Sequence, residues 1–223
     1  MSAIAMTDDL FFNRAGLDRS RAEGIVADAL KGGDDGELFL EFNQSEALSF
    51  DDGKLKSASF DVTQGFGLRA VAGEAHAYAH ASELSEAALK RAAATVKAVH
   101  AGHGGTLAEP PVGTNRHLYS DDNPLAKLDF SAKVEILQQI DAYARAKDPR
   151  VRQVMASISG NWQAVQIIRG DGSRAADIRP LVRLNVSIMV EENGRMETGS
   201  HGTGGRFAYE HVIDPATWKA GVD

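Results

Sequence analysis

The segment from Gly199 to Arg206 contains the residues of this sequence best suited to binding a ligand. It reads Gly-Ser-His-Gly-Thr-Gly-Gly-Arg, so its glycines leave backbone N–H groups accessible, and Arg206 adds a fork of guanidinium donors. This pattern predicts a loop that holds an anion or a peptide carboxylate, with His201, Gly204, Gly205 and Arg206 as substrate-binding residues. The alternative is a long flexible hairpin loop that binds nothing.

The same segment matches neither of two common nucleotide-binding motifs. No Gly-Lys-Ser or Gly-Lys-Thr follows the glycines, as a P-loop requires. The segment also lacks the strand-to-helix context of a dinucleotide site. The segment is therefore not predicted to bind a nucleotide.

Three polar aromatic side chains share one face of a predicted strand at residues 75–81. Alanines alternate with His76, Tyr78 and His80, so these three side chains point to one side and the alanines to the other. The alanine face would let a helix approach closely, and the aromatic face could bind a metal or a partner. A zinc site needs a third or fourth ligand with supporting groups, and none is evident nearby, so the structural interpretation is favoured.

The sequence lacks the residues that metal-dependent peptide hydrolysis requires. No histidine is followed by glutamate, so the two histidines and the glutamate base of a zincin helix are missing. His100 and His103 suit the negative end of a helix better than a metal. The absence of cysteine excludes thiol nucleophiles and thiolate ligands. We therefore predict no catalytic residue and no metal ligand. The composition alone does not exclude a Ser–His–Asp triad, but the sequence contains no Gly-x-Ser-x-Gly elbow to support one.

Composition and charge narrow the class of partner. Apolar residues make up 43% of the 223 residues, charged residues make up 25%, and the net charge is −7, as in ordinary globular proteins. No block of basic residues could follow a phosphate backbone, so we expect no nucleic-acid partner. No stretch reaches the roughly 18 apolar residues of a membrane span. The first residues do not form a signal peptide, so we expect no membrane partner and a cytoplasmic location.

Helix and strand signals place these residues in two α+β units. The first unit has a predicted helix at residues 18–31, strands within residues 37–81 and a helix at residues 83–100. Asp52-Gly53 and Gly73-Glu74 are predicted turns between its strands. The second unit begins with a helix that starts near Asp129 and stops at Asp148-Pro149, followed by strands. The clearest strand covers residues 181–191, with Val182, Leu184, Val186, Ile188 and Val190 on one face. Its predicted turns are Gly160-Asn161, Gly170-Asp171-Gly172 and Asn193-Gly194, and its predicted last strand is Arg206–Val212.

The glycines and prolines between the two units predict a linker at residues 105–128. The predicted domains are therefore an N-terminal α+β domain at residues 1–104 and a middle α+β domain at residues 129–223. Each would pack one long helix on an antiparallel meander sheet, which gives an α+β fold class.

Three segments of the chain resemble the N-terminal and middle regions of the TldD/PmbA family of zinc metallopeptidases. They are DVTQGFGLRA from Asp61, DIRPLVRL from Asp177 and GGRFAYE from Gly204, in the family's order. The resemblance covers the chain from about Asp18 onward. It implies a cytoplasmic bacterial peptidase, often called a modulator of DNA gyrase, that hydrolyses unfolded peptides. It also implies a related partner subunit of the TldE/PmbA type that lacks zinc.

The resemblance places the family's zinc ligands and catalytic glutamate on a His-Glu-x-x-x-His helix of a C-terminal domain, with a cysteine further on. This sequence contains neither, so we expect that domain to be absent, this chain to be inactive alone, and zinc only in a full-length relative. The leading hypothesis is a non-catalytic portion that contributes chamber wall and subunit interface, with residues 199–206 along the peptide path. The alternatives are a standalone peptide- or protein-binding module, or another enzyme that uses His76 and His80 or His201.

Overall fold

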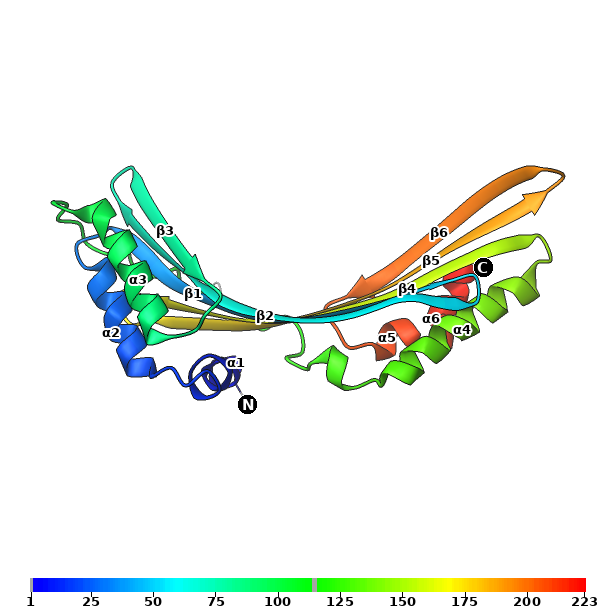
Figure 1. The fold of residues 1–223 in the computed structure, drawn as a ribbon, viewed down its shortest axis with the longest axis horizontal. Helices are drawn as coiled ribbons and strands as arrows, with labels where there is room; N and C mark the ends of the chain where they lie inside the picture. The colour runs from blue at the N-terminus through cyan, green and yellow to red at the C-terminus, as the bar shows by residue number, and fades with distance from the viewer. Residues whose placement is uncertain (1, 114–115) are drawn as a thin grey trace. The chain divides into compact units, whose positions relative to one another are not determined.

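The computed structural model describes residues 2–113 and 116–223, whose strands form one six-stranded antiparallel sheet (Figure 1). The order across the sheet is β3-β2-β1-β4-β5-β6. The strands are β1 (Asp35–Asp51), β2 (Lys54–Ala72), β3 (Ala75–Ala81), β4 (Val151–Arg169), β5 (Arg174–Glu192) and β6 (Arg195–Gly205). The predicted α+β class is confirmed, although the strands join one sheet rather than two separate meanders.

Six α-helices accompany the sheet in the described residues. They are α1 (Ala3–Asp8), α2 (Arg19–Leu30), α3 (Glu86–Lys97), α4 (Phe130–Lys147), α5 (Glu210–Ile213) and α6 (Pro215–Val222). A π-helical turn at Asp9–Asn13 and 3-10 turns at Ala98–His100 and Pro124–Ala126 complete the regular structure. Among the described helices, none has the length and apolar character needed to cross a membrane.

The chain divides into two units, and β1, β2, β4 and β5 each contribute residues to both. Unit 1 draws on residues 1–43, 63–118 and 163–178, and unit 2 draws on residues 44–62, 119–162 and 179–223. Each unit therefore combines segments that are distant in the sequence. The domain limits expected at residues 104 and 129 stay a prediction. Residues 114–115 of the expected linker lie outside the described residues.

In unit 1, α2 packs against α3, and α3 packs against β3. The predicted helix at residues 18–31 is confirmed, because α2 follows Asp18, whose side chain accepts a hydrogen bond from the Arg21 N–H at 2.8 Å. α3 contacts β3, whose alanine face is the less exposed one, as the alternation predicted. The helix begins after Ser85, later than predicted, because the Ser85 hydroxyl accepts a hydrogen bond from the Ala88 N–H.

Unit 2 has its core between one face of the sheet and helices α4, α5 and α6 (Figure 1). α4 follows Asp129 and ends before Asp148-Pro149, so the predicted helix is confirmed. Its apolar stripe is buried against residues of the sheet and of α6, which are Leu48, Phe50, Ile158, Leu184, Val186 and Trp218. Full burial of one such aliphatic or aromatic side chain stabilises a fold by roughly 1.5–3 kcal/mol, so this layer holds unit 2 together.

Two hairpins have the turn chemistry that the sequence predicted. The backbone φ angles are 50° and 76° at Asp52-Gly53, and 55° and 81° at Asn193-Gly194. A type I′ turn requires positive φ at both central residues, and Asp, Asn and Gly adopt it at the lowest cost. The second turn sets the register of β5 and β6, in which Val186 lies opposite His201 and Val182 lies opposite Gly205.

The turn predicted at Gly160-Asn161 is wrong, because β4 continues through these residues without a break. Gly160 serves a close approach instead. A Cβ atom added there would lie 2.2 Å from the hydroxyl oxygen of Tyr209 and 2.5 Å from Cδ2 of Leu125. Gly160 is therefore needed for close packing within unit 2. In the sequence, a glycine needed for packing cannot be distinguished from a glycine in a turn.

The loop predicted at residues 199–206 is also wrong, because residues 199–205 belong to β6. The hairpin before this strand keeps it paired with β5 as far as Gly205, so the glycines lie in extended backbone. The strand predicted at Arg206–Val212 is instead a bend followed by α5. The glycine-rich composition suggested a flexible loop, whereas the preceding turn and the pairing with β5 decided the structure.

Candidate functional site

β6 is the last strand of the sheet, and no strand of the described residues lies along its outer edge. Residues Arg195 to Gly202 are all exposed. In a two-residue hairpin the residues that flank the turn form a hydrogen-bonded pair, and such pairs alternate along antiparallel strands. Glu192 pairs with Arg195, so the backbone groups of Thr198 and Ser200 point outward. Another extended chain can pair with an edge of this kind.

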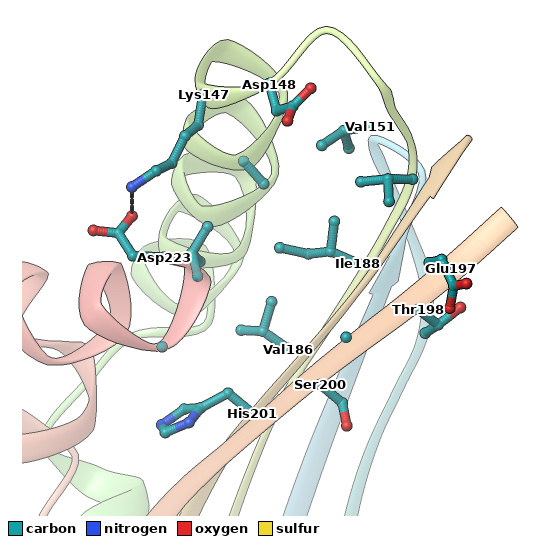
Figure 2. Close-up of a pocket in the computed structure, with 15 residues that line it drawn as sticks. Lys147, Asp148, Val151, Val186, Ile188, Glu197, Thr198, Ser200, His201 and Asp223 are labelled. Carbon is teal, nitrogen blue, oxygen red and sulfur yellow. Dashed lines mark hydrogen bonds and ion pairs between the residues drawn. The ribbon is translucent and has the colours of Figure 1, made fainter. Parts of the chain in front are cut away.

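A groove of about 510 Å³ lies beside β6 within unit 2 (Figure 2). Val186, Ile188 and Val190 of β5 form its apolar floor, on the strand face that the alternating sequence predicted to be apolar. Residues at the end of α4 and in α6 complete the lining. The groove, called the β6 groove below, therefore offers apolar surface directly beside the exposed backbone of β6.

Of the predicted site residues, His201 lines the β6 groove, and Gly204, Gly205 and Arg206 do not. The side chain of His201 shares a strand face with its partner Val186 and points toward α6 (Figure 2). Gly221 of α6 makes room for it, since an added Cβ would lie 2.5 Å from Cδ2 of His201. The imidazole ring is thereby placed against the helix backbone.

Charged side chains line the groove near the end of α4. Lys147 is ion-paired with Asp223 (Figure 2), which also accepts a hydrogen bond from the Tyr143 hydroxyl at 3.0 Å. The hydrogen bond from Lys147 is the main reason that the pKa of Asp223 lies below its ordinary value. Hydrogen bonds from Arg150 lower the pKa of Asp148 to about 2. These carboxylates are therefore charged at neutral pH, and they make this end of the groove hydrophilic.

Gly204, Gly205 and Arg206 serve packing in this structure. A Cβ atom at Gly204 would lie 2.3 Å from the carbonyl oxygen of Val182, and one at Gly205 would lie 2.3 Å from the ring of Phe207. Arg206 donates a hydrogen bond of 3.5 Å to the Pro180 carbonyl, and its guanidinium carbon lies 5.3 Å from the Tyr119 ring centroid. Gly204 and Gly205 line a small cavity of about 280 Å³ together with Arg183 and Gly202, but neither His201 nor Arg206 lines it. The substrate site predicted from these four residues therefore stays a prediction.

The residues of α4 and α6 that complete the groove were not predicted from the sequence. Lys147 and Asp148 are distant from β6 in the sequence, and the space that Gly221 leaves for His201 depends on how α6 packs. The one usable signal was the run Val186, Ile188 and Val190, whose alternation predicted a continuous apolar face. That face extends beyond the part covered by the core, and the remainder forms the groove floor.

His76, Tyr78 and His80 are exposed on β3 in unit 1, with the Tyr78 and His80 rings stacked at 5.7 Å. His103 lies 2.8 Å from a carboxylate oxygen of Asp34, and His100 is buried. No group of three or more His, Cys, Asp or Glu side chains within the described residues is arranged to hold a metal ion. These histidines therefore do not fit the zinc centre that the family resemblance implies, and we assign no catalytic step to them.

Two family models match separate parts of the chain. Residues 36–99 match the PmbA/TldA metallopeptidase domain 1, and residues 123–220 match the PmbA/TldA metallopeptidase central domain. A metalloprotease TldD homolog from Haemophilus influenzae is 41% identical over 181 residues, which cover 80% of this chain and 38% of that protein. A metalloprotease TldD homolog from Buchnera aphidicola (subspecies Schizaphis graminum) is 33% identical over 181 residues, covering 81% and 38%. The chain thus spans well under half the length of these relatives.

Solved structures with low sequence identity share the fold. TldE from Thermococcus kodakarensis superposes with a TM-score of 0.72 at 13% identity, covering 91% of this chain and 46% of that chain. A protein described as a modulator of DNA gyrase from Thermotoga maritima superposes with a TM-score of 0.70 at 15% identity, covering 90% and 47%. The resemblance seen in three sequence segments is confirmed. This chain belongs to the PmbA/TldD metallopeptidase family and corresponds to its first and central domains.

Proposed function

We propose that this chain forms the part of a TldD-type metallopeptidase that holds an unfolded peptide next to the catalytic region. The observation that carries the proposal is the exposed edge of β6 directly beside the β6 groove. An extended peptide that pairs with β6 would gain main-chain hydrogen bonds, and every second side chain would point toward the groove. Main-chain pairing does not depend on sequence, which suits a protein that handles many unfolded peptides.

Hydrolysis would take place outside these residues. The printed names of the relatives describe metalloproteases, and the full-length relatives are longer than this chain. In this proposal a zinc centre elsewhere in the full-length protein cuts the peptide, and this chain contributes to the chamber wall. A TldE-type subunit is the proposed partner, and the cytoplasm is the proposed location. The alternative of a standalone binding module has no separate observation in its favour.

The outward backbone of Thr198 allows a direct test of the peptide site. Thr198→Pro removes an N–H group from the outer edge and leaves the pairing with β5 intact, whereas Thr198→Ala keeps that N–H group and is the matched control. The probe is an acetylated and amidated hexapeptide of alternating valine and threonine. It is titrated into the ¹⁵N-labelled chain while amide shifts are followed by NMR.

We expect saturable shifts at residues 195–202 in the unchanged chain and in Thr198→Ala. Thr198→Pro should weaken binding by about fivefold to tenfold, because the peptide loses a main-chain hydrogen bond and meets a proline ring. Equal affinities of the proline and alanine variants would rule out pairing along this edge. Shifts confined to other strands would do the same.

A further inference from the structure

The open face of the unit 2 sheet, opposite helices α4–α6, has a second cleft of about 360 Å³. Ser49 of β1, Ser157 of β4, Asn185 and Ser187 of β5 and Ser200 of β6 line it together with Arg183. These β5 residues alternate with Leu184 and Val186, which are buried on the helix side. Side chains from neighbouring strands therefore gather on a face that carries no helix of unit 2.

Arg183 is held in place in this cleft by neutral groups. Its Nε donates a hydrogen bond of 2.8 Å to Oδ1 of Asn185, and Nδ2 of Asn185 lies 3.4 Å from Oγ of Ser157. A Cβ atom added at Gly202 would lie 3.0 Å from Nη2 of Arg183, so the guanidinium lies over that glycine. The two terminal nitrogens of Arg183 are therefore held in place, and they donate to no carboxylate of the described residues.

Arg183 differs in this respect from three arginines on or directly before the neighbouring strands β4 and β6. Arg150 and Arg152 form ion pairs with Glu192 and Glu191, and Arg195 forms one with Glu197. Arg183 has no ion pair within residues 2–113 and 116–223, and no Asp or Glu lines its cleft. In a chain with a net charge of −7, an arginine held beside hydroxyl groups and away from carboxylates marks a site for an added negative group.

The donors available in the cleft match a carboxylate. A guanidinium offers a planar fork that fits the two oxygens of a carboxylate, and serine hydroxyls can donate to the remaining lone pairs. The hydroxyls of Ser187 and Ser200 make no hydrogen bond to another side chain in the described residues, so they can serve a ligand. We propose that this cleft binds a carboxylate group of a peptide, at its C-terminus or on an acidic side chain. The carboxylate chemistry stands on the cleft alone, whereas a peptide as its source rests on the proposed function.

NMR titrations of the ¹⁵N-labelled chain with three blocked peptides test this proposal. The probes are acetyl-Ala-Ala with a free C-terminal acid, acetyl-Ala-Ala-amide and acetyl-Asp-Ala-amide. We expect the first or the third, and not the neutral amide, to shift the amides of Arg183, Asn185 and Ser187, which lie outside residues 195–202. The first and third probes distinguish a terminal carboxylate from a side-chain carboxylate. Inorganic phosphate serves as a competitor, and displacement of the peptide only at large excess is the expected result.

Variants separate recognition from a loss of structure. Arg183→Gln should weaken the acidic peptide at least about tenfold, and Arg183→Lys should recover part of this loss, because charge remains without the fork. Ser187→Ala should weaken binding about threefold. Arg152→Gln, on β4 outside both the cleft and the β6 edge, is the matched control and should bind normally. A dispersed amide spectrum for each variant shows that it is folded.

Two outcomes would overturn the proposal. One is equal affinity for the acid and the amide, and the other is unchanged binding by Arg183→Gln. Failure here is distinguishable from failure of the peptide site on β6. If the neutral hexapeptide shifts residues 195–202 but carboxylates leave the cleft unaffected, only this inference fails. If acidic peptides shift the cleft while the neutral hexapeptide does not bind, only the proposed edge pairing fails.

Discussion

The hydroxyl of Tyr209 donates a hydrogen bond of 2.7 Å to Oε1 of Glu46, deep within unit 2. The same carboxylate oxygen lies 2.5 Å from Nζ of Lys133, whose side chain is only 2% exposed. Burial, reinforced by this hydrogen bond, raises the pKa of Tyr209 far above its ordinary value, so the phenol is protonated at every physiological pH. These three side chains connect β1, α4 and the segment before α5.

Removing the charge of Glu46 should therefore destabilise unit 2. Glu46→Gln leaves Lys133 as a buried ammonium without a counter-charge, which costs on the order of 3–5 kcal/mol of unfolding free energy. Urea unfolding at pH 7, followed by circular dichroism, measures the effect. The double variant Glu46→Gln with Lys133→Met should recover part of the loss, because no unpaired charge remains. A single variant as stable as the original chain would contradict the structural role of this ion pair.

A methyl group at Gly160 should disturb the same network. The added Cβ would meet the Tyr209 hydroxyl at 2.2 Å, and that hydroxyl cannot move away without losing Glu46. We expect Gly160→Ala to lower the unfolding free energy by about 1–3 kcal/mol, the range for overpacking a core. Gly199→Ala is the matched control, because it is also a strand glycine and has nothing within 4 Å of its added Cβ. Similar stability of the two variants would refute the close approach.

Features fixed by neighbouring residues could be predicted from the sequence. The Asp18 cap, the Asn193-Gly194 turn and the alternation along β5 each depend on local backbone preferences. The family was also predictable, since segments such as that from Asp61 carry its pattern in order. The relation of Gly160 to Tyr209 could not be predicted, because it depends on which strand and which bend meet in space.

The candidate site shows the same limit. His201 and Arg206 were predicted to share one site because they are near neighbours in the sequence. In the structure His201 lies on the groove face of β6, whereas Arg206 follows the end of the strand. The sequence alone does not distinguish Arg183 from other arginines, because an arginine on the polar side of an alternating strand is common. Its significance comes from the absence of a carboxylate partner among the described residues, and only the structure shows this.

The Asp148–Arg150 pair at the end of α4 predicts a pH dependence. Hydrogen bonds from Arg150 lower the pKa of Asp148 from 3.8 to about 2 in the folded chain. Because the folded pKa is lowered, the stabilisation by this pair is fully present above pH 3.8 and is lost as the pH falls toward 2. NMR titration of the Asp148 carboxyl carbon should give a midpoint near 2, and Arg150→Gln should move it toward 3.8. A midpoint near 3.8 in the unchanged chain would contradict the pairing.

The arrangement of histidines predicts that this chain alone neither holds zinc tightly nor cuts peptides. His76 and His80 lie on an exposed strand face, and His201 lies in the β6 groove. No described set of three donors surrounds any of them. A tight zinc site with hydrolytic activity needs at least three protein ligands and a base for the bound water.

After dialysis against a chelator and addition of one equivalent of zinc, gel filtration with metal analysis should leave the chain metal-free. A quenched fluorescent peptide should stay intact. His76→Ala with His80→Ala is the control for weak surface binding. Zinc that is retained at one per chain, and lost in that double variant, would restore the hypothesis of an enzyme that uses these two histidines.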